Sequence, residues 1–418
     1  MAKDSEWRKK ELSLKEVIEK YPELPPLWIL KADVQRRGTY YTGAALEKLD
    51  PKIHVVLENN EPGFHSGKAK EPEGLIMKDG SYLVTNFDFD PNKPQRDPYI
   101  IDVEDDTIVI KDQGEILAEA VGYWEKPDYY DRKASNGVWL SKYVTARPQR
   151  LNVNMNWYCH FWDTPGEGCK YCPWTPNFLK SGLKEERNDF KYVGEAIHEA
   201  LKQKGRYSAI MISGGSVLSG EELLDDEVDG YIELLKVIGE NFSARRFPAQ
   251  LIATAFNEKQ LERLYENTGL MNYTTDIEVL DEERFNWICA GKAKHIGYQE
   301  WKRRLYAAVD VFGRGNVTSG VVLGTELAKP HGFVSEEEAY KHVTEEAEKI
   351  ISHGVALAAN IWRTSPGSVF HKQDTPSLEY FVKTYKKFDE LQHQYQVNPY
   401  TDDYRRCGAH IGLDLLRI

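Results

Sequence analysis

The chain has 418 residues, a length that allows one large domain with a smaller one, or two to three domains. Hydrophobic residues make up 41% and charged residues 29%, values that exclude wholesale disorder. Acidic residues outnumber basic ones by 66 to 54, so the net charge of −12 argues against a nucleic-acid partner. No apolar run is long enough for a membrane-spanning helix, and the charged start MAKDSEWRKK lacks a signal core. We therefore expect a cytoplasmic protein that does not enter membranes.

Residues 1–147 do not alternate strand with helix. An amphipathic stretch over 12–21 predicts a helix that ends at a proline-rich break over 22–26. From about residue 74 the pattern changes to short strands, and the segment 99–112 predicts a hairpin around an Asp-Asp turn. We expect a small N-terminal α+β, β-rich region that acts as a packing module or as a lid.

From residue 148 the pattern becomes strand followed by helix, six times in succession. The predicted strands are RLNVNMNWY, SAIMISGG, PAQLIATAF, YTTDIEVL, NVTSGVVLG and VALAANIWR. This alternation predicts a parallel sheet with right-handed crossovers, which is an α/β fold of the partial or full (β/α) barrel, or TIM barrel, type. We assign 148–375 to a (β/α)6 barrel core and 376–418 to a C-terminal helix and tail that pack on it. In such barrels the chemistry lies at the carboxyl ends of the strands.

Three of the five cysteines lie on the loop after the first barrel strand. They are Cys159, Cys169 and Cys172, spaced so that nine and then two residues separate them. Thiolates bind zinc or iron–sulfur clusters. Three cysteines leave one position of a zinc site, or one iron of a [4Fe–4S] cluster, without a protein thiolate. His160 adjoins Cys159 too closely to be a convenient fourth zinc ligand. The two remaining cysteines are distant in sequence, so a zinc loop and an iron–sulfur site both remain open.

The segment Cys169-Lys170-Tyr171-Cys172 resembles the final part of the cysteine motif of the radical SAM superfamily, and the branches most similar are those of biotin synthase and lipoyl synthase. The first spacing, nine residues, departs from the three that are commonest in the family. The resemblance implies an oxygen-sensitive [4Fe–4S] cluster on the three cysteines, with S-adenosylmethionine (SAM) on the fourth iron. It also implies reductive SAM cleavage to a 5′-deoxyadenosyl radical, a ferredoxin or flavodoxin as electron donor, and a small-molecule, biosynthetic substrate.

The same resemblance assigns further SAM-binding positions at the ends of later strands. Gly214, Gly215 and Ser216 correspond to the segment that binds the methionyl amino group, and Tyr171 to the position near the adenine. Glu278 stands two residues after Asp276 on the predicted fourth strand, at a polar position that contacts SAM. Lys292 is assigned to the SAM carboxylate, with Lys294 and Arg304 as alternatives. Val322 and Leu323 are assigned to apolar contacts with the adenine, and Arg363 is the polar residue after the last strand.

Two other functions are compatible with the sequence. A zinc-bearing scaffold without catalysis would use the same cysteines. A radical SAM methyltransferase that uses cobalamin would need a cobalamin-binding domain, and residues 1–147 lack the α/β pattern of one. The sequence does not indicate the substrate, the hydrogen-abstraction site or the roles of Cys289 and Cys407.

Overall fold

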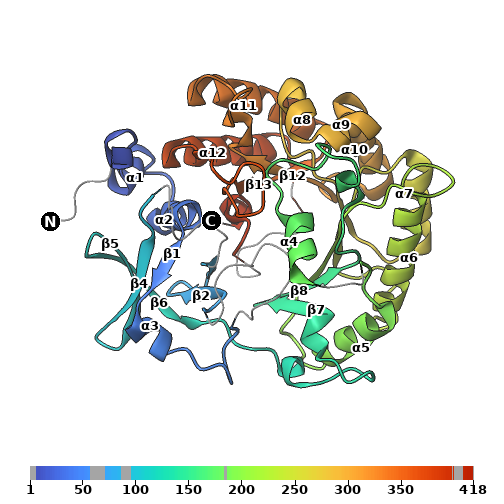
Figure 1. Cartoon of the computed structure of the whole chain (residues 1–418), viewed down its shortest axis with the longest axis horizontal. Helices are drawn as coiled ribbons and strands as arrows, with labels where there is room; N and C mark the ends of the chain where they lie inside the picture. Colours follow the sequence, from blue (N-terminus) through green and yellow to red (C-terminus); the bar gives the residue numbers. More distant parts are fainter. Residues whose placement is uncertain are drawn as a thin grey trace.

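The structure is a computed structural model that describes residues 6–56, 71–85, 96–182, 186–397, 399 and 408–417. Two sheets organise the described chain, one in the N-terminal region and one in the larger C-terminal part (Figure 1). The larger sheet has the order β13-β12-β11-β10-β9-β8-β7. Its strands are β7 Val144–Arg147, β8 Arg150–Asn154, β9 Ala209–Ser213, β10 Ala249–Ile252, β11 Asn272–Thr274, β12 Val317–Leu323 and β13 Ala356–Ile361.

The six strands from β8 to β13 pair in parallel, each with the next, as predicted. The order is linear and ends at β13 and β7, so the sheet is a partial barrel. Strand β7 is an unpredicted addition that pairs antiparallel with β8 and forms one edge. The α/β fold class and the partial-barrel architecture are confirmed.

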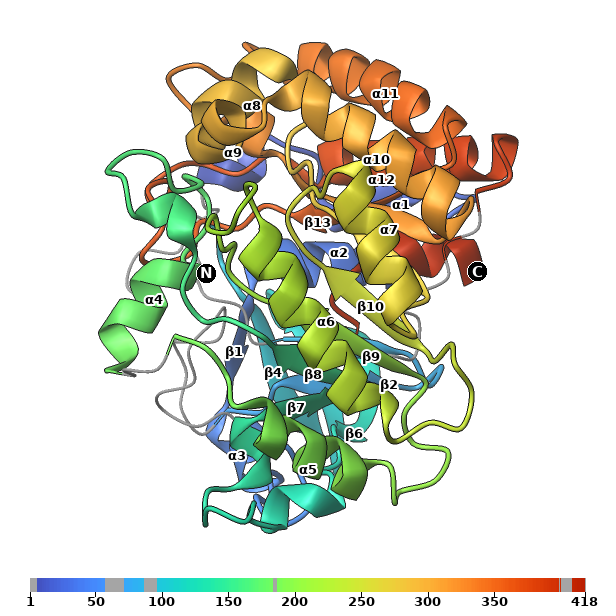
Figure 2. The same cartoon turned by 90° about the vertical axis from the view of Figure 1, so that its right-hand side faces the viewer.

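Helices follow the parallel strands, and most of them cover the outer face of the sheet (Figure 2). They are α4 Trp174–Ser181, α5 Phe190–Ala200, α6 Asp225–Gly239, α7 Glu258–Asn267, α8 Glu282–Ile288, α9 Ala290–His295, α10 Tyr298–Phe312, α11 Glu336–Ser352 and α12 Leu378–Gln394. Most of them bury an apolar face; α10, for example, buries Trp301, Leu305 and Ala308 at successive turns.

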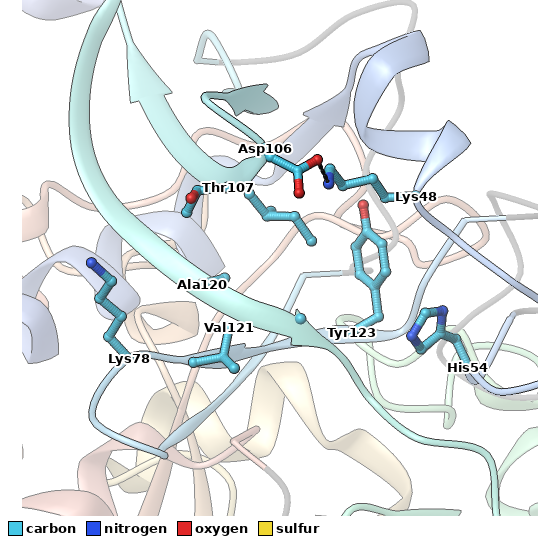
Figure 3. A pocket seen from close by; sticks show the side chains of 10 residues that line it. Lys48, His54, Lys78, Asp106, Thr107, Ala120, Val121 and Tyr123 are labelled. Carbon is cyan, nitrogen blue, oxygen red and sulfur yellow. Dashed lines mark hydrogen bonds and ion pairs between the residues drawn. The ribbon is translucent and has the colours of Figure 1, made fainter.

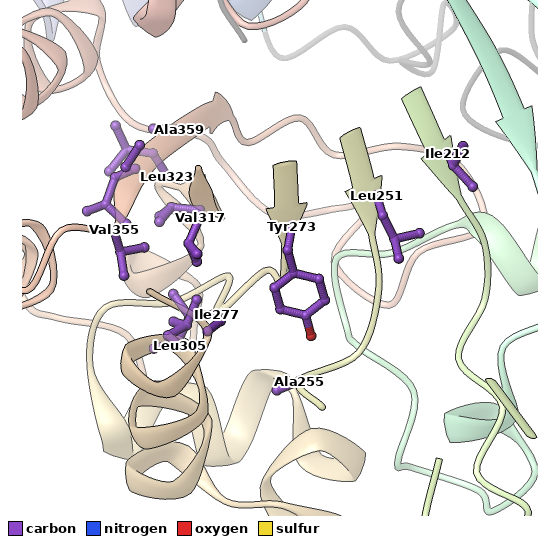
Figure 4. Close-up of a cluster of buried hydrophobic side chains, with 14 of the residues drawn as sticks. Ile212, Leu251, Ala255, Tyr273, Ile277, Leu305, Val317, Leu323, Val355 and Ala359 are labelled. Carbon is purple, nitrogen blue, oxygen red and sulfur yellow. The ribbon is translucent and has the colours of Figure 1, made fainter. Parts of the chain in front are cut away.

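The barrel core lies between the sheet and these helices. Leu251, Tyr273 and Val317 come from neighbouring strands and are fully buried (Figure 4). Ile277 and Leu305 pack beneath them, from the segment after β11 and from α10. Burial of this apolar surface is the main force that holds the strands in register, and it fixes the loops at their carboxyl ends.

The N-terminal sheet has the order β1-β4-β5-β6-β2-β3. Its strands are β1 Thr39–Tyr41, β2 Gly74–Met77, β3 Tyr82–Val84, β4 Tyr99–Glu104, β5 Thr107–Asp112 and β6 Glu115–Tyr123, with the helices α1 Leu14–Lys20, α2 Pro26–Arg37 and α3 Gly43–Glu47 beside them. The predicted hairpin is β4–β5, in which Ile101 pairs with Ile110. Asp105 and Asp106 both have positive φ, 46° and 68°, as a two-residue hairpin turn requires.

Helix α2 was not predicted, because the prolines before it suggested a break. Pro26 instead occupies the first turn of the helix, where its missing N–H costs nothing. Every residue of α2 from Trp28 to Arg37 is buried. The indole of Trp28 donates to the carbonyl of Ile411 at 2.8 Å, and Lys31 pairs with Asp414 at 3.1 Å. Both partners lie in the C-terminal 3-10 helix η6 (Ile411–Arg417), so α2 joins the two ends of the chain.

A shallow hollow lies on the outer part of the N-terminal sheet (Figure 3). It is lined by strand and loop residues that include Lys48, His54, Lys78 and Asp106. None of the candidate site residues lines it. A search of the described residues for a helix long and apolar enough to cross a membrane finds none.

Candidate active site

The chain around Cys159 is fixed by the loop that follows β9. The ladder between β8 and β9 continues past both strands, through Met155 N to Ser213 O at 2.7 Å and Gly215 N to Asn156 O at 2.9 Å. A Cβ on Gly215 would lie 2.0 Å from the carbonyl oxygen of Tyr158 and 2.7 Å from Cα of Cys159. The predicted close approach at Gly215 therefore occurs, and the glycine touches the cysteine backbone itself.

Ser216 extends this contact with its own polar groups. Its carbonyl accepts from the amide of His160 at 2.9 Å, and its hydroxyl lies 2.7 Å from the hydroxyl of Thr254. Burial raises the pKa of Cys159 to about 11, while hydrogen bonds from Ser216 act in the opposite direction and favour the thiolate. His160 pairs with Asp163 at 3.0 Å.

Cys169 is held from the other side, by the start of α9 and the end of α8. Two backbone hydrogen bonds join the segments: Lys170 N to Ile288 O at 3.0 Å and Gly291 N to Glu167 O at 2.8 Å. These two hydrogen bonds place Cys289 beside Cys169. A hydrogen bond from the Cys289 thiol is the main influence that lowers the pKa of Cys169. The two cysteines are distant in sequence, so only the fold shows that they are neighbours.

Three predicted SAM-binding residues meet next to Cys169. Lys292 pairs with Glu278 at 2.8 Å and donates to the carbonyl of Asp276 at 2.7 Å. The side chains of Lys292 and Glu278 are only 11% and 12% exposed, so the pair is largely removed from water. Burial raises the pKa of Glu278, and Lys292 and a hydrogen bond from Tyr171 partly offset it. Tyr171 also lies near Cys169, and burial with these neighbours keeps its pKa well above the usual value.

Most of the strand predicted over 273–280 is wrong, because only residues 273 and 274 belong to a strand. Strand β11 ends at Thr274, and Glu278 has φ +68°, a left-handed conformation that L residues adopt rarely. Asp276 accepts from the amide of Gly320 at 2.7 Å, while Glu278 forms a single bridge with Val321. A strained residue held by its surroundings is a feature of functional sites, and this one carries the carboxylate that meets Lys292.

The remaining predicted residues lie at varied distances from this group. Val322 donates its amide to the carbonyl of Glu278 at 2.9 Å, so β12 runs beside the Glu278 segment. Leu323 is fully buried in the barrel core. Arg363 is half-buried after β13, where its charge partly offsets the rise that burial causes in the pKa of Tyr385. The two alternatives to Lys292 are engaged elsewhere: Lys294 with Glu167, and Arg304 with Glu300 at 2.8 Å.

Within the described residues, no three His, Cys, Asp or Glu side chains already form a metal-binding cage. The three cysteines nevertheless act on one another electrostatically. Burial raises the pKa of Cys172 well above its usual value, and the neighbouring Cys169 and Cys159 raise it further. Because burial disfavours the thiolates of Cys159 and Cys172, whereas the pKa of Cys169 is lowered, a bound cationic centre would be needed to ionise the first two. This donor set therefore fits a thiolate-bound metal cluster.

Comparisons with known proteins follow this geometry. No protein-family model matches the chain. A curated relative is the bacteriochlorophyllide c C-7(1)-hydroxylase of Chlorobaculum limnaeum, which is 23% identical over 367 residues, covering 82% of this chain and 84% of that protein. The similarity thus spans most of both chains.

Two solved structures are loosely similar. A radical SAM methyltransferase from Sphaerobacter thermophilus has a TM-score of 0.41 at 11% identity, over 74% of this chain and 78% of that one. A methylornithine synthase has a TM-score of 0.40 at 11% identity, over 68% and 79%.

The sequence missed Cys289, Thr254 and Glu227, which the fold places around the cysteine loop. Only Glu227 leaves a signal, since it shares a helix face with the buried Tyr231 and Leu234. The motif itself stands where the sequence placed it, on the first loop of a partial (β/α) barrel, with Tyr171, Glu278 and Lys292 beside it. This combination of a cysteine motif and a partial (β/α) barrel is the one that the resemblance to the radical SAM superfamily implies.

Proposed function

We propose that this protein binds a [4Fe–4S] cluster through Cys159, Cys169 and Cys172 and cleaves SAM reductively to act on a small organic molecule. The observation that carries the proposal is the assembly of Tyr171, Glu278 and Lys292 next to Cys169. When bound and reduced by one electron, the cluster with SAM would supply methionine and a 5′-deoxyadenosyl radical that removes hydrogen from the substrate.

The chain's own residues prepare this chemistry in two ways. Gly214 and Gly215 leave room on one side of the cysteine loop, where a Cβ at Gly215 would collide with the backbone. On the other side, Lys292 offers a buried cation for a carboxylate and Glu278 a buried anion for an ammonium group. An amino acid carries both charges on one carbon, so this pair suits the methionyl end of SAM.

Tyr171 and Trp157 help to exclude water. Tyr171 is half-buried between Cys169 and Glu278, and the indole of Trp157 stacks on Trp174 with ring centres 5.8 Å apart. Apolar surroundings strengthen the interactions of charged groups and protect reactive species from solvent. Val322 lies beside the Glu278 segment and is the apolar residue we assign to the adenine.

The curated relative supports a reaction at a carbon–hydrogen bond of the substrate. That protein hydroxylates bacteriochlorophyllide c at C-7(1), a reaction that replaces hydrogen on carbon. We propose a reaction of this general class here, with a small metabolite as substrate and a ferredoxin or flavodoxin as electron donor.

Anaerobic reconstitution followed by turnover with SAM and dithionite tests the proposal. We expect a brown protein with about four irons per chain, the content of one [4Fe–4S] cluster. We also expect 5′-deoxyadenosine as the nucleoside product, formed only when dithionite is present. A colourless protein with one zinc would establish the scaffold function instead. S-adenosylhomocysteine as the only nucleoside product would establish simple methyl transfer.

A further inference from the structure

Glu227 is a buried carboxylate that links two loops at the carboxyl ends of the parallel strands. It stands in the first turn of α6 and is 1% exposed. One oxygen accepts from the amide of Thr254 at 2.9 Å, and the other accepts from the amide of Val217 at 2.9 Å and the hydroxyl of Thr254 at 2.8 Å. The loops after β9 and β10 are therefore both hydrogen-bonded to the carboxylate of Glu227.

Two hydroxyl groups, linked by hydrogen bonds, connect the carboxylate of Glu227 to Cys159. The hydroxyl of Thr254 lies 2.7 Å from that of Ser216. Ser216 in turn hydrogen-bonds to Cys159 through its amide and its hydroxyl. Gly215 fixes the register, because its contact with Tyr158 and Cys159 leaves no room for a side chain. Glu227 thus reaches Cys159 through two intervening side chains without touching it.

The hydrogens on these hydroxyl groups can be arranged in two ways, depending on whether Glu227 is ionised. Each hydroxyl has one hydrogen, and an ionised carboxylate only accepts. With Glu227 ionised, Thr254 donates to Glu227, and Ser216 can donate to Thr254. With Glu227 protonated, Glu227 donates to Thr254 and Thr254 donates to Ser216, so the Ser216 hydrogen is left for the sulfur of Cys159. Burial raises the pKa of Glu227 to about 7, so both forms are populated near neutral pH.

We propose that Glu227 is a positioning residue that sets, through Thr254, whether the Ser216 hydroxyl donates to the Cys159 sulfur. The inference rests on the proposed cluster, because hydrogen bonds to cluster sulfurs help to set its reduction potential. With the cluster bound, one-electron reduction by a donor of the ferredoxin or flavodoxin class would favour the arrangement in which Ser216 donates to the sulfur, so an ionised Glu227 would take up a proton from solvent. The reduction potential therefore falls as pH rises through the range in which Glu227 titrates.

Other ionisable groups face Glu227 and have to be separated from its effect. His160 lies close enough for its charge to favour the ionised carboxylate. The phenols of Tyr231 and Tyr273 also face it, with pKa values above the usual one. Because His160 adjoins Cys159, the test uses variants that leave His160 unchanged.

The test is a redox titration of the reconstituted protein without SAM, monitored by electron paramagnetic resonance, at pH values on both sides of 7. We expect the wild-type potential to fall with rising pH and the slope to be lost in Thr254→Val and Ser216→Ala. Thr254→Val removes the hydroxyl but keeps both amide bonds to Glu227. Thr254→Ser restores the hydroxyl and should restore the slope, which a merely structural role would not require.

Glu326→Gln is the matched control. Glu326 is equally buried, and burial likewise raises its pKa to about 7, but it accepts from the amide of Gly324 after β12 and from Tyr380. This variant should keep the wild-type slope. A full slope in Thr254→Val, or a wild-type potential independent of pH, would overturn the inference while leaving the cluster in place. A wild-type protein that binds no cluster would instead refute the proposed function.

Discussion

At the scale of single residues, Gly215 has the least tolerance for a side chain. Its Cβ would lie 2.0 Å from a backbone carbonyl, and neither backbone can move without breaking the β8–β9 ladder. Overpacking of this kind costs ~1–3 kcal/mol, and more where backbone must shift. Gly215→Ala should therefore lower the melting temperature and the iron content after reconstitution. Gly122→Ala, at a position with nothing within 4 Å of the added Cβ, should change neither.

The pair of Lys292 and Glu278 gives a second prediction at this scale. Lys292→Met leaves a buried carboxylate without its cation, which typically costs ~3–5 kcal/mol, and removes the proposed partner of the SAM carboxylate. Anaerobic equilibrium dialysis should show SAM affinity lowered by at least tenfold. Lys302→Met breaks a pair with Glu346 of equal side-chain exposure, 12% on each side, away from the cysteines. Comparable SAM affinity in the two variants would contradict the assignment of Lys292.

Individual residues also show where prediction from sequence ends. The cysteine spacing, Gly215, Glu278 and Lys292 could be identified because motif residues are read directly from the chain. Cys289 and Thr254 could not, because each reaches the cysteine loop from a different strand–helix unit. Their positions depend on strand order and register, which a single sequence does not contain.

At the scale of elements, the turn after β12 contains a buried acid with a testable effect on stability. Burial raises the pKa of Glu326 from an ordinary 4.5 to about 7. The folded protein therefore binds a proton more tightly than the unfolded chain, and this stabilisation is lost as pH rises from 4.5 through about 7. The shift corresponds to roughly 3 kcal/mol.

Denaturant unfolding of wild type and Glu326→Gln across this pH range measures the effect. The amide cannot ionise, so the unfolding free energy of the variant should fall less as the pH rises. A difference between the two proteins that stays constant with pH would show that Glu326 ionises normally in the folded state.

The parallel strands and outer helices were predictable as elements because hydrophobic periodicity reports them directly. Two errors have physical reasons. The alternation over 273–280 suggested a strand, but Ile277 and Val279 are buried in an irregular segment around the positive φ of Glu278. The prolines before α2 suggested a break, although proline also begins helices, and burial of α2 depends on the distant η6 segment.

At the scale of the whole molecule, buried charges fasten the N-terminal region to the barrel. Arg36 pairs with Asp33 at 2.6 Å and with Glu11 at 2.8 Å, and its side chain is 1% exposed. It also donates to the carbonyl of Pro376, at the start of the barrel's last helix, at 3.3 Å. Such contacts favour a fixed packing module over a lid that opens as one body.

Scanning calorimetry tests this coupling. We expect a single unfolding transition for both parts of the chain, because separating them exposes paired, desolvated charges. Arg36→Met should lower the melting temperature, because it removes one of the two cations that pair with each of the buried carboxylates of Asp33 and Glu11; Arg37 and Arg96 remain. Two transitions in the wild-type protein would show instead that the N-terminal region folds and moves independently.

The most direct test of the account is electron paramagnetic resonance of the anaerobically reconstituted, dithionite-reduced protein, recorded with and without SAM. We predict one [4Fe–4S] signal that changes shape on SAM addition and disappears when Cys159, Cys169 or Cys172 is replaced by Ala. Cys289→Ala, which removes the neighbour of Cys169 but no proposed ligand, should retain the signal. A signal that SAM leaves unchanged, or that survives loss of any one of the three cysteines, would contradict the account.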